Sequence, residues 1–240
     1  MSDLTKEANS AVNPEAEGVT IILAHHGQDQ WGTFEKDPTT GAKKIPLGFN
    51  QKESQLSEFG ETQASSIGKY LIENGLVPDC ATIVGCPRTE KTFEEMNLGI
   101  EDKHVLADEE LYDADVDQLG SEIQMAGMKH SGNSEAKTFL LVARKPNIHD
   151  LAKKFADPDS ADAIDKAVKD HENGTVVVVN LPQTNSFVDI YDTEQEPDPA
   201  TGFPPFKKGT VRIIVPDNEG SAYELGQEDS VKQDLELEEP

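Results

Sequence analysis

Two adjacent histidines, His25 and His26, follow an apolar run and precede a glycine. The run Val19 to Leu23 is apolar and largely β-branched, which is typical of a buried strand. Gly27 permits a tight turn directly after it. Both histidines are therefore expected at the carboxyl end of a strand, where open α/β sheets bind their ligands. Imidazoles in such a place can transfer protons or ligate a metal ion.

A metal site is one interpretation of the paired histidines, but their placement disfavours it. Adjacent strand positions point to opposite faces, so His25 and His26 chelate one ion only if the turn begins between them. The spacing of Cys80 and Cys86 fits no common zinc pattern. The remaining histidines are scattered without ligand spacing: His104, His130, His149 and His171. We expect neither a metal nor a cofactor.

The stretch His25-His26-Gly27-Gln28, followed by Trp31, resembles the signature of the histidine phosphatase superfamily, which includes phosphoglycerate mutase-like phosphatases and phosphohistidine phosphatases. The resemblance implies that His26 is the nucleophile and becomes phosphorylated on a ring nitrogen. His25 stands where the family has an arginine. A guanidinium is permanently charged and grips phosphate with two hydrogen bonds, whereas an imidazole is mostly neutral at pH 7.

The segment from Leu56 to Ala64 resembles a second family element, Leu-(Ser/Thr)-x-x-Gly-x-x-Gln-Ala, which packs on the sheet after the catalytic strand. Its own pattern predicts a helix. Ser57 is a plausible N-cap, apolar residues recur on one face, and Gly75 is a plausible C-terminal cap.

The sequence Cys86-Pro87-Arg88 leaves a predicted strand and opens a helix, and Thr92 lies one turn further on. It resembles the family segment whose arginine is the second phosphate ligand, so the resemblance assigns that role to Arg88. The one or two residues that usually separate proline from arginine are missing here. The alternative is a surface arginine near a helix N-terminus, a position that favours anions in any case.

Two further family positions are less well defined. Leu111-Tyr112-Asp113 resembles the segment that often supplies the general acid. Asp113 would act as a general acid only if its pKa were raised and if it lay above the phosphate. The alternative is a solvated carboxylate. The second catalytic histidine falls on Arg144 if the strand 138–143 carries it, and on Leu181 if the strand 175–180 does. Neither alignment supplies a histidine.

The family pocket implies two arginines, a nucleophilic histidine and a second histidine. His26 and Arg88 remain in this chain, while His25 and either Arg144 or Leu181 stand at the other two positions. If Arg144 lies in the pocket, it replaces the positive charge that His25 does not guarantee. His25, His26, Arg88 and Arg144 would then form an altered phosphate site.

Losing one preorganised charge-stabilising group typically costs about a hundred-fold or more in rate. We therefore expect a catalytically impaired protein that binds phosphate, a phosphorylated small molecule or a phosphoprotein. Two alternatives remain open. One is an active phosphomonoesterase or phosphohistidine phosphatase that works through a phospho-His26 intermediate. The other is a non-catalytic interaction or scaffold protein that uses an acidic surface.

The charge balance limits the partners. Lysine and arginine total 21 against 46 aspartates and glutamates, which gives a net charge of -25. Such a charge opposes binding to nucleic acid and to anionic membranes. It is typical of a highly soluble or salt-adapted surface, or of a surface that meets a basic protein. The N-terminus lacks signal-peptide features and no apolar run approaches the roughly 18 residues of a membrane span, so we expect a cytoplasmic protein.

A chain of 240 residues suits one α/β domain. We predict a three-layer α/β/α sandwich with a mainly parallel central sheet, phosphoglycerate mutase-like, over residues 18–216. A disordered acidic N-terminus is expected over 1–17, and an acidic C-terminal tail over 217–240. Beyond the elements already named, the pattern predicts strands at 81–84 and 210–215 and a helix at 161–169. Residues 120–133 are weakly helical and then looped.

Overall fold

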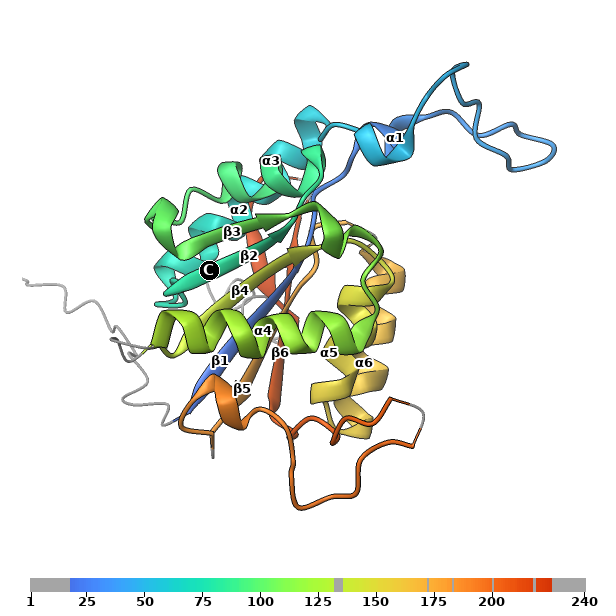
Figure 1. The fold of residues 1–240 in the computed structure, drawn as a ribbon. Helices are drawn as coiled ribbons and strands as arrows, with labels where there is room; N and C mark the ends of the chain where they lie inside the picture. Colours follow the sequence, from blue (N-terminus) through green and yellow to red (C-terminus); the bar gives the residue numbers. More distant parts are fainter. Residues whose placement is uncertain are drawn as a thin grey trace, which may run out of the picture.

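The computed structural model of the chain describes residues 18–131, 136–171, 173–182, 184–199, 201–217 and 219–225. A seven-stranded sheet with the order β3-β2-β4-β1-β5-β6-β7 forms its centre (Figure 1). The strands β1 to β4 are parallel to one another, while β5, β6 and β7 continue the sheet in antiparallel pairs. The strands are β1 Val19–His25, β2 Cys80–Val84, β3 Val105–Asp108, β4 Thr138–Ala143, β5 Val176–Leu181, β6 Thr210–Pro216 and β7 Ala222–Glu224.

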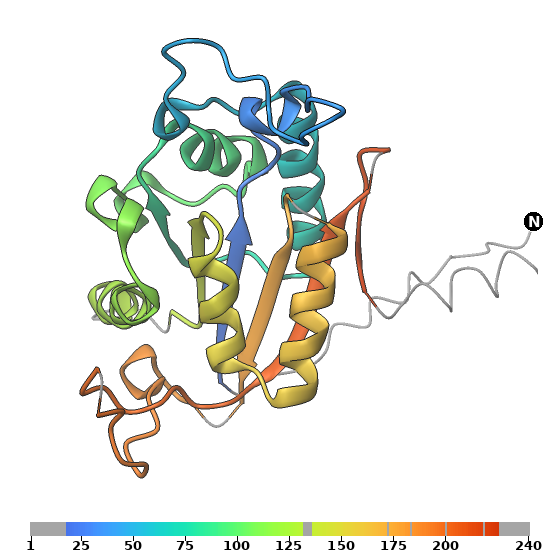
Figure 2. The same ribbon diagram turned by 90° about the vertical axis from the view of Figure 1, so that its right-hand side faces the viewer.

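Helices cover both faces of this sheet (Figures 1 and 2). One apolar cluster joins α2 and α3 to one face, and a larger cluster joins α4, α5 and α6 to the other. The α-helices are α1 Gln30–Thr33, α2 Glu58–Glu73, α3 Pro87–Met96, α4 Val116–Ser131, α5 Asn147–Phe155 and α6 Pro158–Asp170. Short 3-10 helices are η1 Gln51–Glu53, η2 Asp102–His104, η3 Glu109–Asp113 and η4 Phe187–Asp189. The expected three-layer α/β/α sandwich is confirmed.

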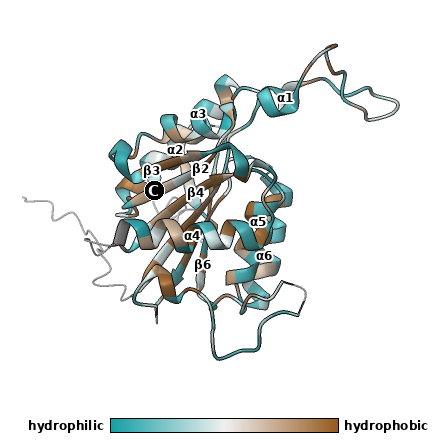
Figure 3. Ribbon diagram, in the orientation of Figure 1, coloured by the Kyte–Doolittle hydropathy of each residue, from teal (hydrophilic) through white to brown (hydrophobic). Residues whose placement is uncertain are grey.

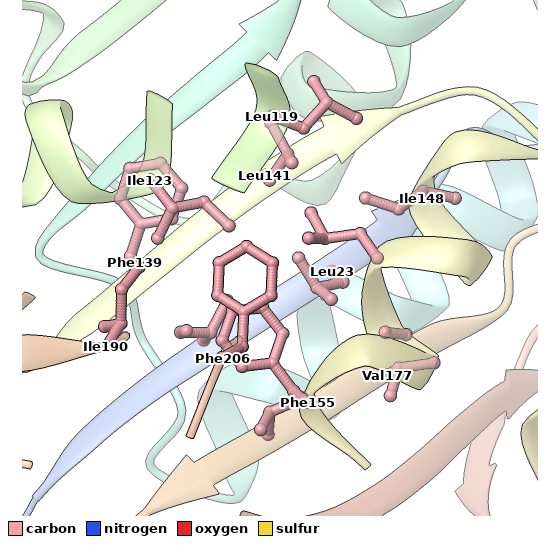
Figure 4. Packing of buried hydrophobic residues seen from close by; sticks show 14 of the residues in the cluster. Leu23, Leu119, Ile123, Phe139, Leu141, Ile148, Phe155, Val177, Ile190 and Phe206 are labelled. Carbon is pink, nitrogen blue, oxygen red and sulfur yellow. The ribbon is translucent and has the colours of Figure 1, made fainter. Parts of the chain in front are cut away.

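Strand β1 lies between the parallel and antiparallel halves of the sheet, and it is buried on both faces because helices cover both faces. Ile21 and Leu23 belong to the larger cluster, and Ile22 and Ala24 belong to the cluster under α2 and α3. The central strands are accordingly the most hydrophobic part of the ribbon (Figure 3). Leu23 lies among side chains from α5 and neighbouring strands in Figure 4. The two histidines that follow Ala24 thus lie at the end of a buried central strand.

Local sequence explains where the two helices beside the site begin. The Ser57 side chain accepts a hydrogen bond from the Gly60 N–H and caps α2, as predicted. Pro87 occupies the first turn of α3, where its missing N–H costs nothing. Gly75 has a φ of +67° just after α2, a conformation in which glycine is favoured. In the part of the chain that the structure describes, no helix is long and apolar enough to cross a bilayer.

Three elements differ from the prediction. Residues 120–131 of the segment predicted as weakly helical and then looped belong to α4, a 16-residue helix. The strands β3 and β7 were not predicted. β7 lies within the segment assigned to the acidic tail, and Tyr223 pairs with Val215 of β6, so the sheet continues past residue 216. The expected disordered N-terminus and the rest of the tail, 226–240, lie outside the described residues.

Candidate active site

The carboxyl ends of β1, β2 and β4 meet at one edge of the sheet because these strands are parallel. His25 pairs with Ala143 at the end of β4, and the His26 N–H donates to the Ala143 carbonyl oxygen at 3.3 Å. Arg144, the residue after Ala143, is therefore placed beside His26. Leu181 pairs with Val19, at the opposite end of β1. Of the two positions considered for the second histidine, only Arg144 lies at the edge that carries His26.

The ring of His26 is held in one tautomer. Its Nδ1 lies 2.7 Å from the Gly27 carbonyl oxygen, which can only accept, so Nδ1 carries the proton. Its Nε2 then has a free lone pair and accepts a hydrogen bond from Arg88 Nε at 3.0 Å. Burial and the nearby Arg88 charge lower the His26 pKa to about 3. At neutral pH the ring is uncharged, with a basic nitrogen facing a guanidinium.

Arg88 reaches His26 from the first turn of α3 and is only 2% exposed. Its remaining nitrogens donate to the Gln51 carbonyl oxygen at 2.7 Å and to the Tyr112 hydroxyl at 3.3 Å. A carboxylate oxygen of Asp29 lies 3.7 Å from Arg88 Nε. His26 and Arg88 are thus in direct contact, even though the usual spacer after the proline is missing.

Thr92 links the segment that carries His26 to the segment that carries Arg88. Its hydroxyl donates to the Arg88 carbonyl oxygen at 2.7 Å and accepts from the Gly27 N–H at 3.2 Å. This side chain lies one turn beyond Arg88 on α3, so it can reach both the helix backbone and the turn after His26. The position of α3 is therefore fixed relative to the turn that carries the histidine.

His25 packs between two other imidazoles rather than against Arg88. Its ring centroid lies 4.2 Å from that of His26 and 5.4 Å from that of His149, on the first turn of α5. His25 Nδ1 and His149 Nε2 are buried without a hydrogen-bond partner among the described residues. Burial and the neighbouring ring of His26 lower the His25 pKa well below its ordinary value. His25 is therefore neutral and supplies no charge in place of the expected arginine.

Tyr112 forms a platform for cations at the outer side of the site. The guanidinium of Arg144 lies 4.4 Å from the ring centroid, and its Nε donates to the Tyr112 carbonyl oxygen at 2.7 Å. The same guanidinium pairs with Asp113 at 3.1 Å. The Asp113 side chain is 86% exposed and contacts Arg144 instead of His26. A general acid is usually partly desolvated, so this geometry does not by itself favour the expected role of Asp113.

Sequence reasoning did not single out five of the residues in this arrangement: Asp29, Gln51, Lys52, Tyr112 and His149. One signal was available for His149, because a residue on the first turn of the helix after β4 must lie near the carboxyl edge of that strand. Gln51 offers no signal, since it acts through its backbone carbonyl group. In the described part of the chain, no group of three or more histidine, cysteine, aspartate or glutamate side chains is placed to hold a metal ion.

The sequence matches no protein-family model and no curated protein. The fold, however, matches solved structures. One is a protein described as a phosphohistidine phosphatase, SixA, from Nakamurella multipartitia, with 17% identity over 81% of this chain and 95% of that one, and a TM-score of 0.54. Another, described in the same way, is from Agrobacterium tumefaciens, with 13% identity over 68% and 92% of the two chains, and a TM-score of 0.51. The chain has the fold of the histidine phosphatase superfamily.

Proposed function

We propose that this protein binds phosphate or a phosphorylated ligand at His26, Arg88 and Arg144, and that its phosphatase chemistry is impaired. The observation that carries the proposal is the contact between Arg88 Nε and His26 Nε2 at the carboxyl edge of the sheet. This edge also receives the N-terminus of α3, where the helix dipole favours an anion. Proteins described as phosphohistidine phosphatases share the fold.

The distribution of arginine supports an anionic ligand. The sequence has Arg88, Arg144 and Arg212, and two of these three lie at this one edge of a protein with a net charge of -25. A cationic cluster in such a field attracts an anion locally, although the whole molecule repels it. Arginine is also the side chain best suited to two parallel hydrogen bonds with a phosphoryl group.

Two features, one at His26 and one at His25, support an impaired phosphatase reaction. The lone pair of His26 Nε2, which would attack phosphorus, is engaged by Arg88, so Arg88 must move before a bond can form. The neutral His25 occupies the position where a permanent charge would stabilise the transferring group. Removing one such group typically costs about a hundred-fold or more in rate. Binding tolerates this loss better than catalysis does, because catalysis depends on interactions that strengthen in the transition state.

Replacing Arg88 by glutamine should weaken orthophosphate binding at least about tenfold, since a hydrogen bond to a charged group contributes about 1.5–3 kcal/mol. Calorimetry at pH 7.5 measures this affinity directly. Arg88→Lys, which keeps the charge, should lose less. Arg212→Gln is the matched control, because Arg212 lies on β6 with a 41% exposed side chain and pairs with Glu224. Equal affinity in the wild type and Arg88→Gln would contradict the proposal.

A second candidate function is residual phosphoryl transfer through His26, and the tautomer of its ring favours it. In that reaction Nε2 would form a bond to phosphorus while the bond from phosphorus to the leaving oxygen breaks, and that oxygen would take up a proton. Water would then hydrolyse the phosphohistidine. The test is hydrolysis of a generic phosphomonoester and of a phosphohistidine peptide. Turnover that disappears in His26→Ala would establish this candidate.

Absence of both turnover and phosphate binding would instead favour the third expectation, a scaffold whose acidic surface meets a basic protein. Copurification with such a partner, lost on deletion of residues 217–240 or in high salt, would support it. Because β7 lies in the deleted segment, a shorter deletion of 226–240 is the better variant.

A further inference from the structure

Three positively charged side chains surround the single ring of Tyr112. The charged groups of Arg144, Lys52 and Arg88 lie 4.4 Å, 5.0 Å and 5.7 Å from the ring centroid. The electron-rich ring face attracts cations, but each contact contributes only about 0.5–2 kcal/mol. Like charges gathered this closely repel one another, and within the described residues carboxylates form ion pairs with Arg88 and Arg144 but not with Lys52. The cluster therefore has unbalanced positive charge on its Lys52 side.

The three cationic side chains around Tyr112 differ in how far they are buried. Arg88 is 2% exposed and bonded to His26, whereas the Arg144 side chain is 28% exposed and Lys52 is open to solvent. Lys52 belongs to η1, and the preceding residue of η1 accepts the hydrogen bond of Arg88 through its carbonyl group. Tyr112 contacts both the buried and the exposed cations: its hydroxyl accepts a hydrogen bond from Arg88, and its ring packs against the guanidinium of Arg144. One small ligand could thus touch an inner and an outer group of cations at once.

We propose that Arg144 and Lys52, held against Tyr112, form an outer anion subsite, so that the preferred ligand carries two linked anionic groups, as a diphosphate does. The inference rests on the proposed function: one phosphoryl group replaces the contact of Arg88 with His26, and the second group lies between Arg144 and Lys52. A lone phosphate at His26, Arg88 and Arg144 leaves Lys52 without an anion. A linked second anion gains the outer contacts without a second loss of translational freedom.

Calorimetry with orthophosphate and with methylenediphosphonate, a diphosphate analogue that cannot be hydrolysed, tests the subsite. The wild type should bind the diphosphonate at least about tenfold more tightly, since one charge-assisted contact contributes about 1.5–3 kcal/mol. Lys52→Gln should remove most of that preference while leaving orthophosphate affinity nearly unchanged. Lys69→Gln, an equal change of charge on the exposed face of α2, should affect neither ligand.

The outcomes separate the two proposals. If neither anion binds the wild type, the proposed function itself fails. If orthophosphate binds in an Arg88-dependent manner but the diphosphonate binds no more tightly, the outer subsite alone is wrong. A loss in Lys52→Gln that is equal for both anions would also contradict the subsite, because it would mean that Lys52 acts through general charge. Arg144→Gln provides a second variant, expected to weaken the diphosphonate more than orthophosphate.

Discussion

Gly60→Ala is expected to destabilise the protein by about 3 kcal/mol or more and to displace the turn that carries His26. Gly60 lies in the first turn of α2, directly against the backbone of residues 27 and 28. A Cβ at Gly60 would overlap the Gln28 carbonyl oxygen and lie 2.8 Å from the Gln28 nitrogen. Alanine favours a helix over glycine by about 1 kcal/mol, but the overlap involves backbone atoms, which cannot rotate away, so overpacking dominates.

The same region is held by several hydrogen bonds that a shift of α2 would break. Gln28 N–H donates to the Gln63 side chain at 2.8 Å, and Ser57 donates twice to the Gln28 carbonyl oxygen. Thermal unfolding should show a midpoint about 10 °C lower, since 1 kcal/mol corresponds to about 2–4 °C in a protein of this size. Ser65→Ala, at an exposed position of the same helix, is the control and should change the midpoint little. A wild-type midpoint in Gly60→Ala would show that the turn can move without cost.

Stability should fall steeply below pH 6.5 because His25, His26 and His149 are buried as neutral rings. Burial, and then charged neighbours, lower the pKa of His26 to about 3 and that of His149 to about 4, and lower that of His25 well below its ordinary value. Above pH 6.5 these rings are neutral in both folded and unfolded chains. As the pH falls from 6.5 towards 4, the unfolded chain gains protons that the folded chain does not, so unfolding becomes easier. The loss reaches several kcal/mol, a large part of the typical 5–15 kcal/mol.

Carboxylates also become protonated as the pH falls, and this relieves the repulsion caused by a net charge of -25. A histidine variant separates the contribution of the buried rings from that of the carboxylates. His149→Leu should reduce the slope of unfolding free energy against pH by about 1 kcal/mol per pH unit between pH 6 and pH 5, the value for one proton. Urea unfolding at several pH values measures it. An unchanged slope in His149→Leu would contradict the assignment of a buried neutral ring.

Apolar patterning predicted most of the sheet because β1, β4 and β5 are buried on nearly every residue. The helix α4 was underestimated because Gly120 and Gly127 lower its helix propensity. The structure explains both glycines: a Cβ at Gly120 would overlap the ring of Phe206, and one at Gly127 would overlap Phe187. Packing against Phe206 and Phe187 thus favours glycine at two positions where helix propensity disfavours it. β3 was missed because it is a short edge strand with two exposed residues.

The site was predictable where its residues belong to a local motif. His26 directly follows a strand and Arg88 lies in the first turn of a helix, and both placements follow from the local pattern. The position of Arg144 depended on which strand pairs in parallel with β1, and that is a long-range fact of sheet order. Tyr112, Lys52 and Gln51 come from 3-10 helices without apolar periodicity, so no sequence pattern places them.

The central place of β1 also has a consequence for the order of folding. Ile22 pairs with Leu140 on one side and with Val178 on the other, so both neighbours of the first strand are synthesised long after it. Sheets with such distant pairings fold slowly, since loop closure must precede any gain from contact. On the ribosome the apolar segment before the two histidines cannot pair on both sides until three quarters of the chain has been synthesised. We expect new chains to need protection from aggregation during that interval, and the proposed phosphate site to be among the last parts to form.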